Sequence, residues 1–216
     1  MLSPLPFAVH AMIGCPGHAE LALSLAWTFR DVDAAVVDAA LTRLSESIPE
    51  PVSDSPLDEL RALAELPPRL GPTRRPARSG GVDDLMLDGA LDGSAAHPLM
   101  RAIIAAEAAR RRGLAVGIVS NGREHCIAHT RLGEPLLLRL DVGAIVNAEE
   151  LPPTLTWRCA HEVCGQLLDA LEARWLDEGR PDQALKAAEL RVHLPFDDDG
   201  SEQAQVRLAR VQARFN

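Results

Sequence analysis

The chain has 216 residues, of which 47% are hydrophobic, and a formal net charge of −9 with an isoelectric point near 5.2. An acidic chain with 3% aromatic residues argues against nucleic-acid binding, and arginines that outnumber the single lysine, Lys186, suggest compositional bias rather than a binding patch. No apolar run approaches the ~18 residues that a membrane span requires, and four irregularly spaced cysteines indicate no disulfide framework, so we expect a reduced cytoplasmic protein.

The N-terminal part of the chain is expected to contain two antiparallel helices. Residues 1–17 are rich in Pro and Gly and are predicted to be irregular, with a short edge strand at 7–12. Apolar residues then recur at helical spacing over 19–29 and 34–48, and the carboxylate of Asp33 can cap the second helix. The short link between these segments favours a helical pair that covers one face of the core.

Residues 49–96 form a Pro/Gly-rich insertion with one helix candidate at 56–66. Its stretch 71–81, GPTRRPARSGG, is too polar and too rich in helix breakers to pack, so we expect it to be mobile. An ordinary surface insertion is the simpler interpretation. The alternative is that residues 67–96 act as a lid over a cleft.

The stretch from His97 to Val146 is predicted to be a helix followed by three antiparallel strands. Pro98 suits the first helical position and Gly113 suits the left-handed residue that ends a helix. Apolar residues lie at helical spacing between them and then in β-type runs at 115–119, 125–130 and 135–140.

The C-terminal part is predicted to be helical after a boundary at 151–153, with helices over 155–177, 182–193 and 201–215. The middle of this region resembles half of a tetratricopeptide-type repeat. One such repeat cannot bury its own apolar face, so it must dock on the core or on another chain. We therefore divide the chain into a core at 1–150 and a docked helical extension at 151–216.

The order of these elements resembles the core of the transglutaminase-like superfamily, and within it the SirB1-type proteins. In their pattern an Ile-Pro dipeptide opens the helix, a Glu precedes an Arg-Arg turn, a Gly-His opens a strand and an Asp closes the next. The matching residues here are His97-Pro98, Glu107 before the arginines, Glu124-His125 and Asp141. The resemblance implies an α+β fold, in which a helix packs on a small antiparallel sheet beside N-terminal helices and a helical, tetratricopeptide-like extension.

In the enzymes of this superfamily a Cys at the start of the core helix is the nucleophile, a strand His is its base and an Asp orients the His. The resemblance assigns the last two roles to His125 and Asp141. In the enzymatic alternative described below, Glu107 or Glu124 would assist them. The thiol position falls at Pro98, so the base and its orienting group are present without a nucleophile. The simple alternatives are a strand His without a role and an Asp that caps a loop.

The four cysteines offer one substitute nucleophile. Cys126 follows His125 directly and must point to the opposite face of a strand. Cys159 and Cys164 fall in the apolar pattern of a helix, where a free Cys is usually a small buried hydrophobe. Cys15, beside His18 in a turn-rich segment, is the candidate that could reach a cleft.

We expect neither a metal nor another cofactor. Cys159, His161 and Cys164 diverge on one helix, at ~100° per residue. His125 and His129 share a strand face but should be about 13 Å apart, too far for one ion.

Two functions follow from the sequence. The first is a SirB1-type transglutaminase-like protein without a thiol, which binds a peptide or protein through the vestigial cleft; homo-oligomers are an open possibility. The alternative is an amide- or peptide-directed hydrolase or transferase in which His125 is the general base and Asp141 orients it. An enzyme requires an accessible His125 with a shifted pKa, whereas a binding module can bury it.

Overall fold

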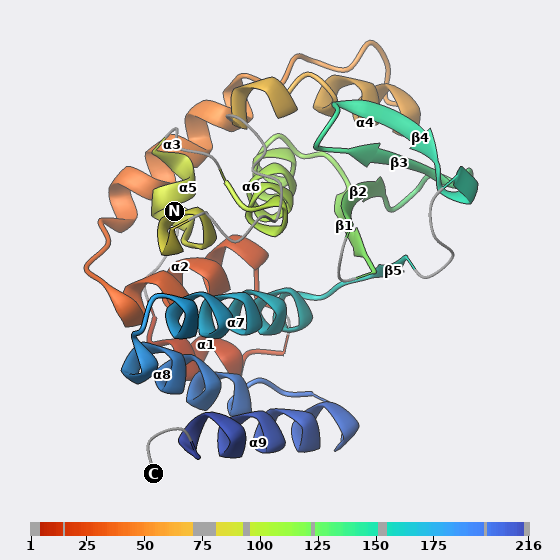
Figure 1. The fold of residues 1–216 in the computed structure, drawn as a ribbon. Helices are drawn as coiled ribbons and strands as arrows, with labels where there is room; N and C mark the ends of the chain where they lie inside the picture. Colours follow the sequence, from red (N-terminus) through yellow and green to blue (C-terminus); the bar gives the residue numbers. More distant parts are fainter. Residues whose placement is uncertain are drawn as a thin grey trace.

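The computed structural model describes residues 5–14, 16–70, 81–92, 96–121, 124–150, 155–196 and 198–213. Helices pack against a five-stranded antiparallel sheet that lies at one edge of the molecule (Figure 1), so the α+β fold class is confirmed. No helix within the described ranges is both long and apolar enough to cross a membrane.

The helices and strands follow the predicted order over most of the chain. The helices are α1 (Phe7–Ala11), α2 (His18–Phe29), α3 (Ala34–Glu46), α4 (Pro56–Leu63), α5 (Leu87–Leu91), α6 (Pro98–Arg111), α7 (Ala160–Asp177), α8 (Pro181–Val192) and α9 (Asp198–Gln212), with 3₁₀ turns η1 (Pro67–Leu70), η2 (Val82–Leu85) and η3 (Ala148–Glu150). The strands are β1 (Val116–Ser120), β2 (His125–His129), β3 (Leu136–Arg139), β4 (Ala144–Asn147) and β5 (Thr156–Trp157).

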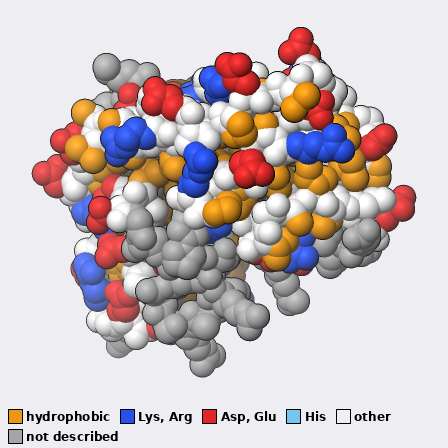
Figure 2. Space-filling view, turned by 90° about the horizontal axis from the view of Figure 1, so that it is seen from above, with side chains coloured by type: hydrophobic (Ala, Val, Ile, Leu, Met, Phe, Trp, Pro, Cys, Tyr) orange, Lys and Arg blue, Asp and Glu red, His pale blue; other side chains and the backbone are white. Residues whose placement is uncertain are grey.

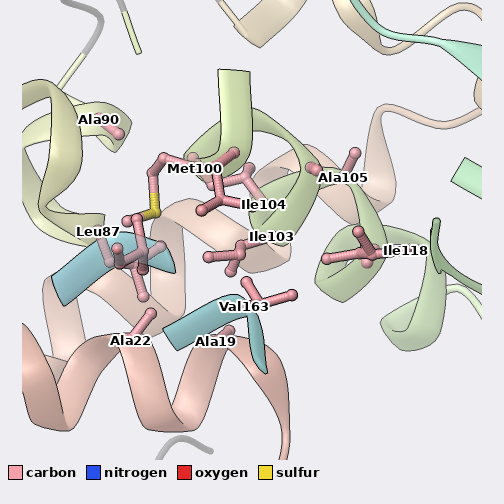
Figure 3. Packing of buried hydrophobic residues seen from close by; sticks show 14 of the residues in the cluster. Ala19, Ala22, Leu87, Ala90, Met100, Ile103, Ile104, Ala105, Ile118 and Val163 are labelled. Atoms are coloured by element: carbon pink, nitrogen blue, oxygen red, sulfur yellow. The ribbon is translucent and has the colours of Figure 1, made fainter. Parts of the chain in front are cut away.

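The helix α6 is the centre of the fold. All its residues from Leu99 to Ala109 are buried, as expected for a helix that has neighbours on every side. Figure 3 shows its side chains between those of α2, α5, β1 and α7. The labelled residues that meet there include Ala19, Ala22, Leu87, Met100, Ile103, Ile118 and Val163.

Both predicted ends of α6 are confirmed. Pro98 occupies the first turn, where its missing N–H is not needed, and Gly113 has φ +82 just after the last turn. The carboxylate of Asp33 likewise accepts hydrogen bonds from the first turn of α3.

The sheet has two different faces. The strand order is β4-β3-β2-β1-β5, and the β1–β2 ladder places Ile118 opposite Ile127 and Ser120 opposite His125. Because successive side chains alternate between faces, His125 and Ser120 share the face of the two isoleucines, which belong to the main core around α6. The opposite face carries a small separate cluster that contains Cys126.

Two predicted elements are wrong. Residues 7–11 form the short helix α1 instead of an edge strand, since Phe7, His10 and Ala11 are buried together at helical spacing and the ring of His10 contacts the Ser24 hydroxyl. The helix predicted from residue 155 begins only at Ala160, because residues 156–157 pair with β1 as β5. Of the stretch 71–81, which is predicted to be mobile, residues 71–80 lie outside the described residues.

The C-terminal helices pack on the core. Leu167, Leu171 and Trp175 of α7 are almost fully buried and belong to the same hydrophobic cluster as α2 and α6. The rings of Trp175 and Phe29 have centroids 4.4 Å apart, and α8 and α9 follow on the outer side of α7 (Figure 1).

Candidate functional site

The start of α6 is occupied by a histidine. His97 is the N-cap residue, and its Nδ1 accepts a hydrogen bond from the backbone N–H of Leu99 at 3.2 Å. The backbone N–H of His97 donates a hydrogen bond to the carbonyl of Asp84 at 2.9 Å, which fixes the backbone at the start of the helix. Because Nδ1 is an acceptor, the imidazole of His97 is neutral and any proton it carries is on Nε2.

His125 lies at the start of β2, on the sheet face that is turned toward α6. Its Nδ1 is 2.9 Å from the hydroxyl of Ser120, the residue directly opposite in the ladder. Ser120 is fully buried. The contact therefore fixes the ring of His125 against β1 through Nδ1.

The two imidazoles share an electropositive environment. Burial lowers the pKa of His125 to about 4, helped by the charge that His97 carries when it is protonated and by the charge of Arg158. Burial and the charge of Arg174 likewise lower the pKa of His97 to about 4. Both rings are therefore neutral at pH 7. We call His97, His125, Arg158 and Arg174 the histidine–arginine cluster.

The arginines of the cluster are anchored by neighbouring groups. Arg158 donates from Nε to the carbonyl of Ser120 at 3.2 Å and forms an ion pair of 2.7 Å with Glu162. Arg174 lies 4.0 Å from the carboxylate of Asp84. His18 adds a further, half-buried imidazole, which contacts the carbonyl of Arg158 at 3.1 Å and whose pKa is lowered by burial.

Asp141 does not orient His125 in this structure. Its carboxylate is bound by Arg139 through Nε at 3.1 Å and Nη2 at 2.6 Å. Arg139 lies opposite Cys126 in the β2–β3 ladder, so Asp141 is held beside Cys126 and not beside His125, which is paired with Ser120. The expected pair of His125 and Asp141 is therefore replaced by two separate contacts.

Glu107 lies at the far end of α6 from the cluster. It is ten residues from His97, or about 15 Å along the helix. Its carboxylate binds Arg110 and Arg111, each through Nε at 2.8 Å. Although burial raises the pKa of Glu107, these hydrogen bonds keep it below its ordinary value. We therefore infer that Glu107 stabilises the last turn of α6 and does not take part in chemistry at His125.

None of the described cysteines lies at the start of α6. Cys126 faces away from His125 as predicted, and burial raises the pKa of its thiol to about 11. Cys164 is buried as expected. Cys159 is exposed and is the N-cap of α7, so its predicted place on a packing face is wrong. Cys15, the candidate substitute nucleophile, lies outside the described residues.

The second histidine of β2, His129, is buried in the core. His129 does not form a site together with His125. Its ring binds the carboxylate of Glu59 at 2.7 Å in the interior, between β2 and α4. In the described part of the chain, no three His, Cys, Asp or Glu side chains come together as metal ligands would.

The sequence pointed to His125 but not to its neighbours. The signal for His97 was present in the His-Pro dipeptide at the predicted helix start, where the ring could be expected to cap the helix. Arg158 and Arg174 come from a segment more than 30 residues away, and only the packing of α7 and β5 brings them to the start of α6.

Comparison with known proteins identified no relative: the chain matches no protein-family model, no curated protein and no solved structure.

Proposed function

We propose that this chain is a SirB1-type, transglutaminase-like protein that has no thiol nucleophile and binds a peptide or protein segment. The order of its elements supports this: helices α2 and α3, a central helix α6, then antiparallel strands with a histidine on the sheet face that belongs to the main core. The helical extension of α7 and α8 supports the tetratricopeptide-like part of the proposal.

The observation that carries the proposal is the composition of the helix start. A thiolate nucleophile would require a cysteine there, with the helix dipole and a protonated imidazole to stabilise it. The position presents His97 and Pro98 instead, and the pKa of both cluster imidazoles lies at about 4. This arrangement has neither the nucleophile nor the cation that thiol catalysis needs.

A groove between α7, α8 and α9 provides a surface for the partner. It has a volume of about 620 Å³, within the range of ligand-binding sites. Most of its lining is charged or polar. Leu176, Val206 and the buried Val211 form its apolar strip, and Glu202 and Arg210 lie beside it. Val206 is 44% exposed. An apolar strip flanked by both charges suits an amphipathic peptide segment.

The enzymatic alternative retains one favourable observation, since a neutral imidazole can accept a proton. A general base works best when its pKa is near the working pH. The pKa of His125, about 4, and the absence of a contact with Asp141 make it a weak and poorly supported base. We therefore place binding ahead of hydrolysis or transfer.

A peptide library displayed to the full chain tests both functions, with capture and cleavage measured on the same peptides. Val206→Glu should weaken capture about tenfold by placing a charge in the apolar strip. Val36→Glu, at a 62% exposed position on α3, is the matched control and should bind like the parent chain. Capture that Val206→Glu leaves unchanged would exclude the groove. Cleavage that is lost in His125→Ala would establish the enzymatic alternative.

A further inference from the structure

A second pocket lies away from both the groove and the histidine–arginine cluster. It opens between α3, η1, α5 and α6 and has a volume of about 230 Å³. We call it the Arg43–Arg69 pocket, after the two arginines that line it. Its apolar lining residues are Ala40, Leu44, Leu70, Ala90, Leu91 and Ile104.

The pocket has an apolar floor and a cationic rim. Ile104 and Leu70 are buried at 1% and 6% exposed area, and Ala90 is also buried. Arg43 and Arg69 are exposed. Figure 2 views the molecule from the side where α3 and α4 lie in Figure 1, and shows Lys or Arg side chains beside hydrophobic ones on that face. A ligand with one apolar end and one anionic end would match this polarity.

The charge of the rim is not neutralised from within. No carboxylate is among the described residues that line the pocket. Arg69 donates from Nη1 to the carbonyl of Ser47 at 2.7 Å, which fixes its position but leaves its charge uncompensated. Among the described side chains, neither Arg43 nor Arg69 has an ion-pair partner. Two guanidinium groups over an apolar floor are therefore available to an anion.

We propose that the Arg43–Arg69 pocket binds a small free carboxylic acid, with its carboxylate at the two arginines and a short branched or linear apolar chain on Ile104 and Leu70. Guanidinium groups match a carboxylate in geometry as well as in charge. The pocket volume lies below the usual range of about 300–1,000 Å³ for drug-sized ligands, which favours an acid of few carbon atoms. Inorganic phosphate would leave the apolar floor unfilled. The site is independent of the proposed peptide binding.

The test is titration of the full chain with 4-methylpentanoate, followed by calorimetry and by the chemical shifts of backbone amides on α3 and α5. The uncharged isostere 4-methylpentanamide and inorganic phosphate are titrated in parallel. We expect the acid to bind and to shift amides around the pocket, and both comparison ligands to bind at least about fivefold more weakly, because each satisfies only one half of the site.

Variants separate the two halves of the pocket. Arg43→Gln together with Arg69→Gln should weaken the acid about tenfold and leave the amide unchanged. Ala40→Leu should exclude both ligands by filling the pocket from a half-buried position. Arg61→Gln, which removes an exposed arginine of α4 outside the pocket, is the control and should bind like the parent chain. Urea denaturation curves that match the curve of the parent chain confirm that each variant is folded.

Three results would overturn the proposal. The first is equal affinity for the acid and its amide, since the rim would then contribute nothing. The second is full binding by the double arginine variant. The third is a preference for a short peptide that ends in leucine over the free acid, which would identify a chain terminus as the ligand.

Discussion

Arg101 is a charged side chain in the middle of the central helix, and it has 3% exposed area. It donates from Nη1 to the carbonyl of Leu70 at 3.1 Å, and from Nη2 to the carbonyls of Pro67 and Leu140 at 3.0 Å each. Burial lowers its pKa, and the charge of Asp141 offsets only part of that effect. A single guanidinium therefore joins η1 and the residue after β3 to α6.

Replacing Arg101 by Met should destabilise the protein strongly. The change keeps most of the side-chain volume but removes the side-chain donor of three carbonyls on buried residues, and each buried group left unpaired costs about 1–3 kcal/mol. We expect the free energy of unfolding in urea to fall by roughly 3 kcal/mol or more. Arg112→Met is the control: among the described side chains Arg112 has an ion pair only with the exposed Glu50, so its loss should cost less than about 1 kcal/mol. Equal unfolding of the two variants would show that Arg101 does not hold η1.

The neutral histidines of the cluster predict a pH dependence of stability. The pKa of His97 and of His125 is about 4 in the folded chain, below the ordinary 6.5 that applies when it is unfolded. Between pH 4 and pH 6.5 the unfolded chain binds more protons than the folded chain. The stability that the two neutral rings contribute is therefore fully present above pH 6.5 and is lost as the pH falls toward 4. We expect the free energy of unfolding to drop by about 1–2 kcal/mol per ring between pH 7 and pH 5.

The matched measurement is urea unfolding at pH 7 and pH 5 for the parent chain and for His97→Gln with His125→Gln. Glutamine does not titrate, so the double variant should lose less stability over this interval. His18 remains as a further imidazole of lowered pKa and will leave some residual slope. If the two proteins lose the same free energy of unfolding between pH 7 and pH 5, then neither cluster histidine is held neutral by the fold.

At the scale of elements, residues that act locally could be predicted and those that act through packing could not. Pro98, Gly113 and Asp33 marked helix ends correctly because capping depends on a few adjacent residues. β5 was missed because two residues, Thr156 and Trp157, owe their strand geometry to pairing with β1, which no local pattern shows.

The same distinction explains the candidate site. His125 was found on a predicted strand, and its face followed from alternation. The hydrogen-bond partner of His125 was not predicted. Whether it is Asp141 or Ser120 depends on the register of three strands and on the ion pair between Arg139 and Asp141. The approach of Arg158 and Arg174 required the docking of β5 and α7, which the sequence pattern left open.

The end of α6 supplies a prediction at this scale. Gly113 has φ +82 and an added Cβ would meet no atom within 4 Å, so the cost of a side chain there is conformational only. We expect Gly113→Ala to lower the free energy of unfolding by about 1 kcal/mol. Gly133→Ala is the matched control, because it also meets no atom within 4 Å but does not have a positive φ, and it should be neutral or slightly stabilising. Thermal unfolding of both variants checks the difference.

At the scale of the whole molecule, the main core runs without interruption from α2 through α6 to α7. Leu167, Leu171 and Trp175 pack in the same hydrophobic cluster as the N-terminal helices. The ammonium group of Lys186 on α8 also contacts the carbonyl of Thr28 on α2 and lies 5.1 Å from the centre of the Phe29 ring. By contrast, Ala204 and Val211 of α9 are buried outside this main cluster.

Removal of residues 151–216 should therefore abolish cooperative folding. The three large α7 side chains contribute about 1.5–3 kcal/mol each by burial, against a typical total stability of about 5–15 kcal/mol. The fragment 1–150 should be insoluble, or should bind a hydrophobic dye and unfold without a sharp thermal transition. A truncation after Phe196 removes only α9 and should keep a cooperative transition at a lower temperature. If residues 1–150 alone unfold sharply, then α7 is an independent unit and the shared core does not require it.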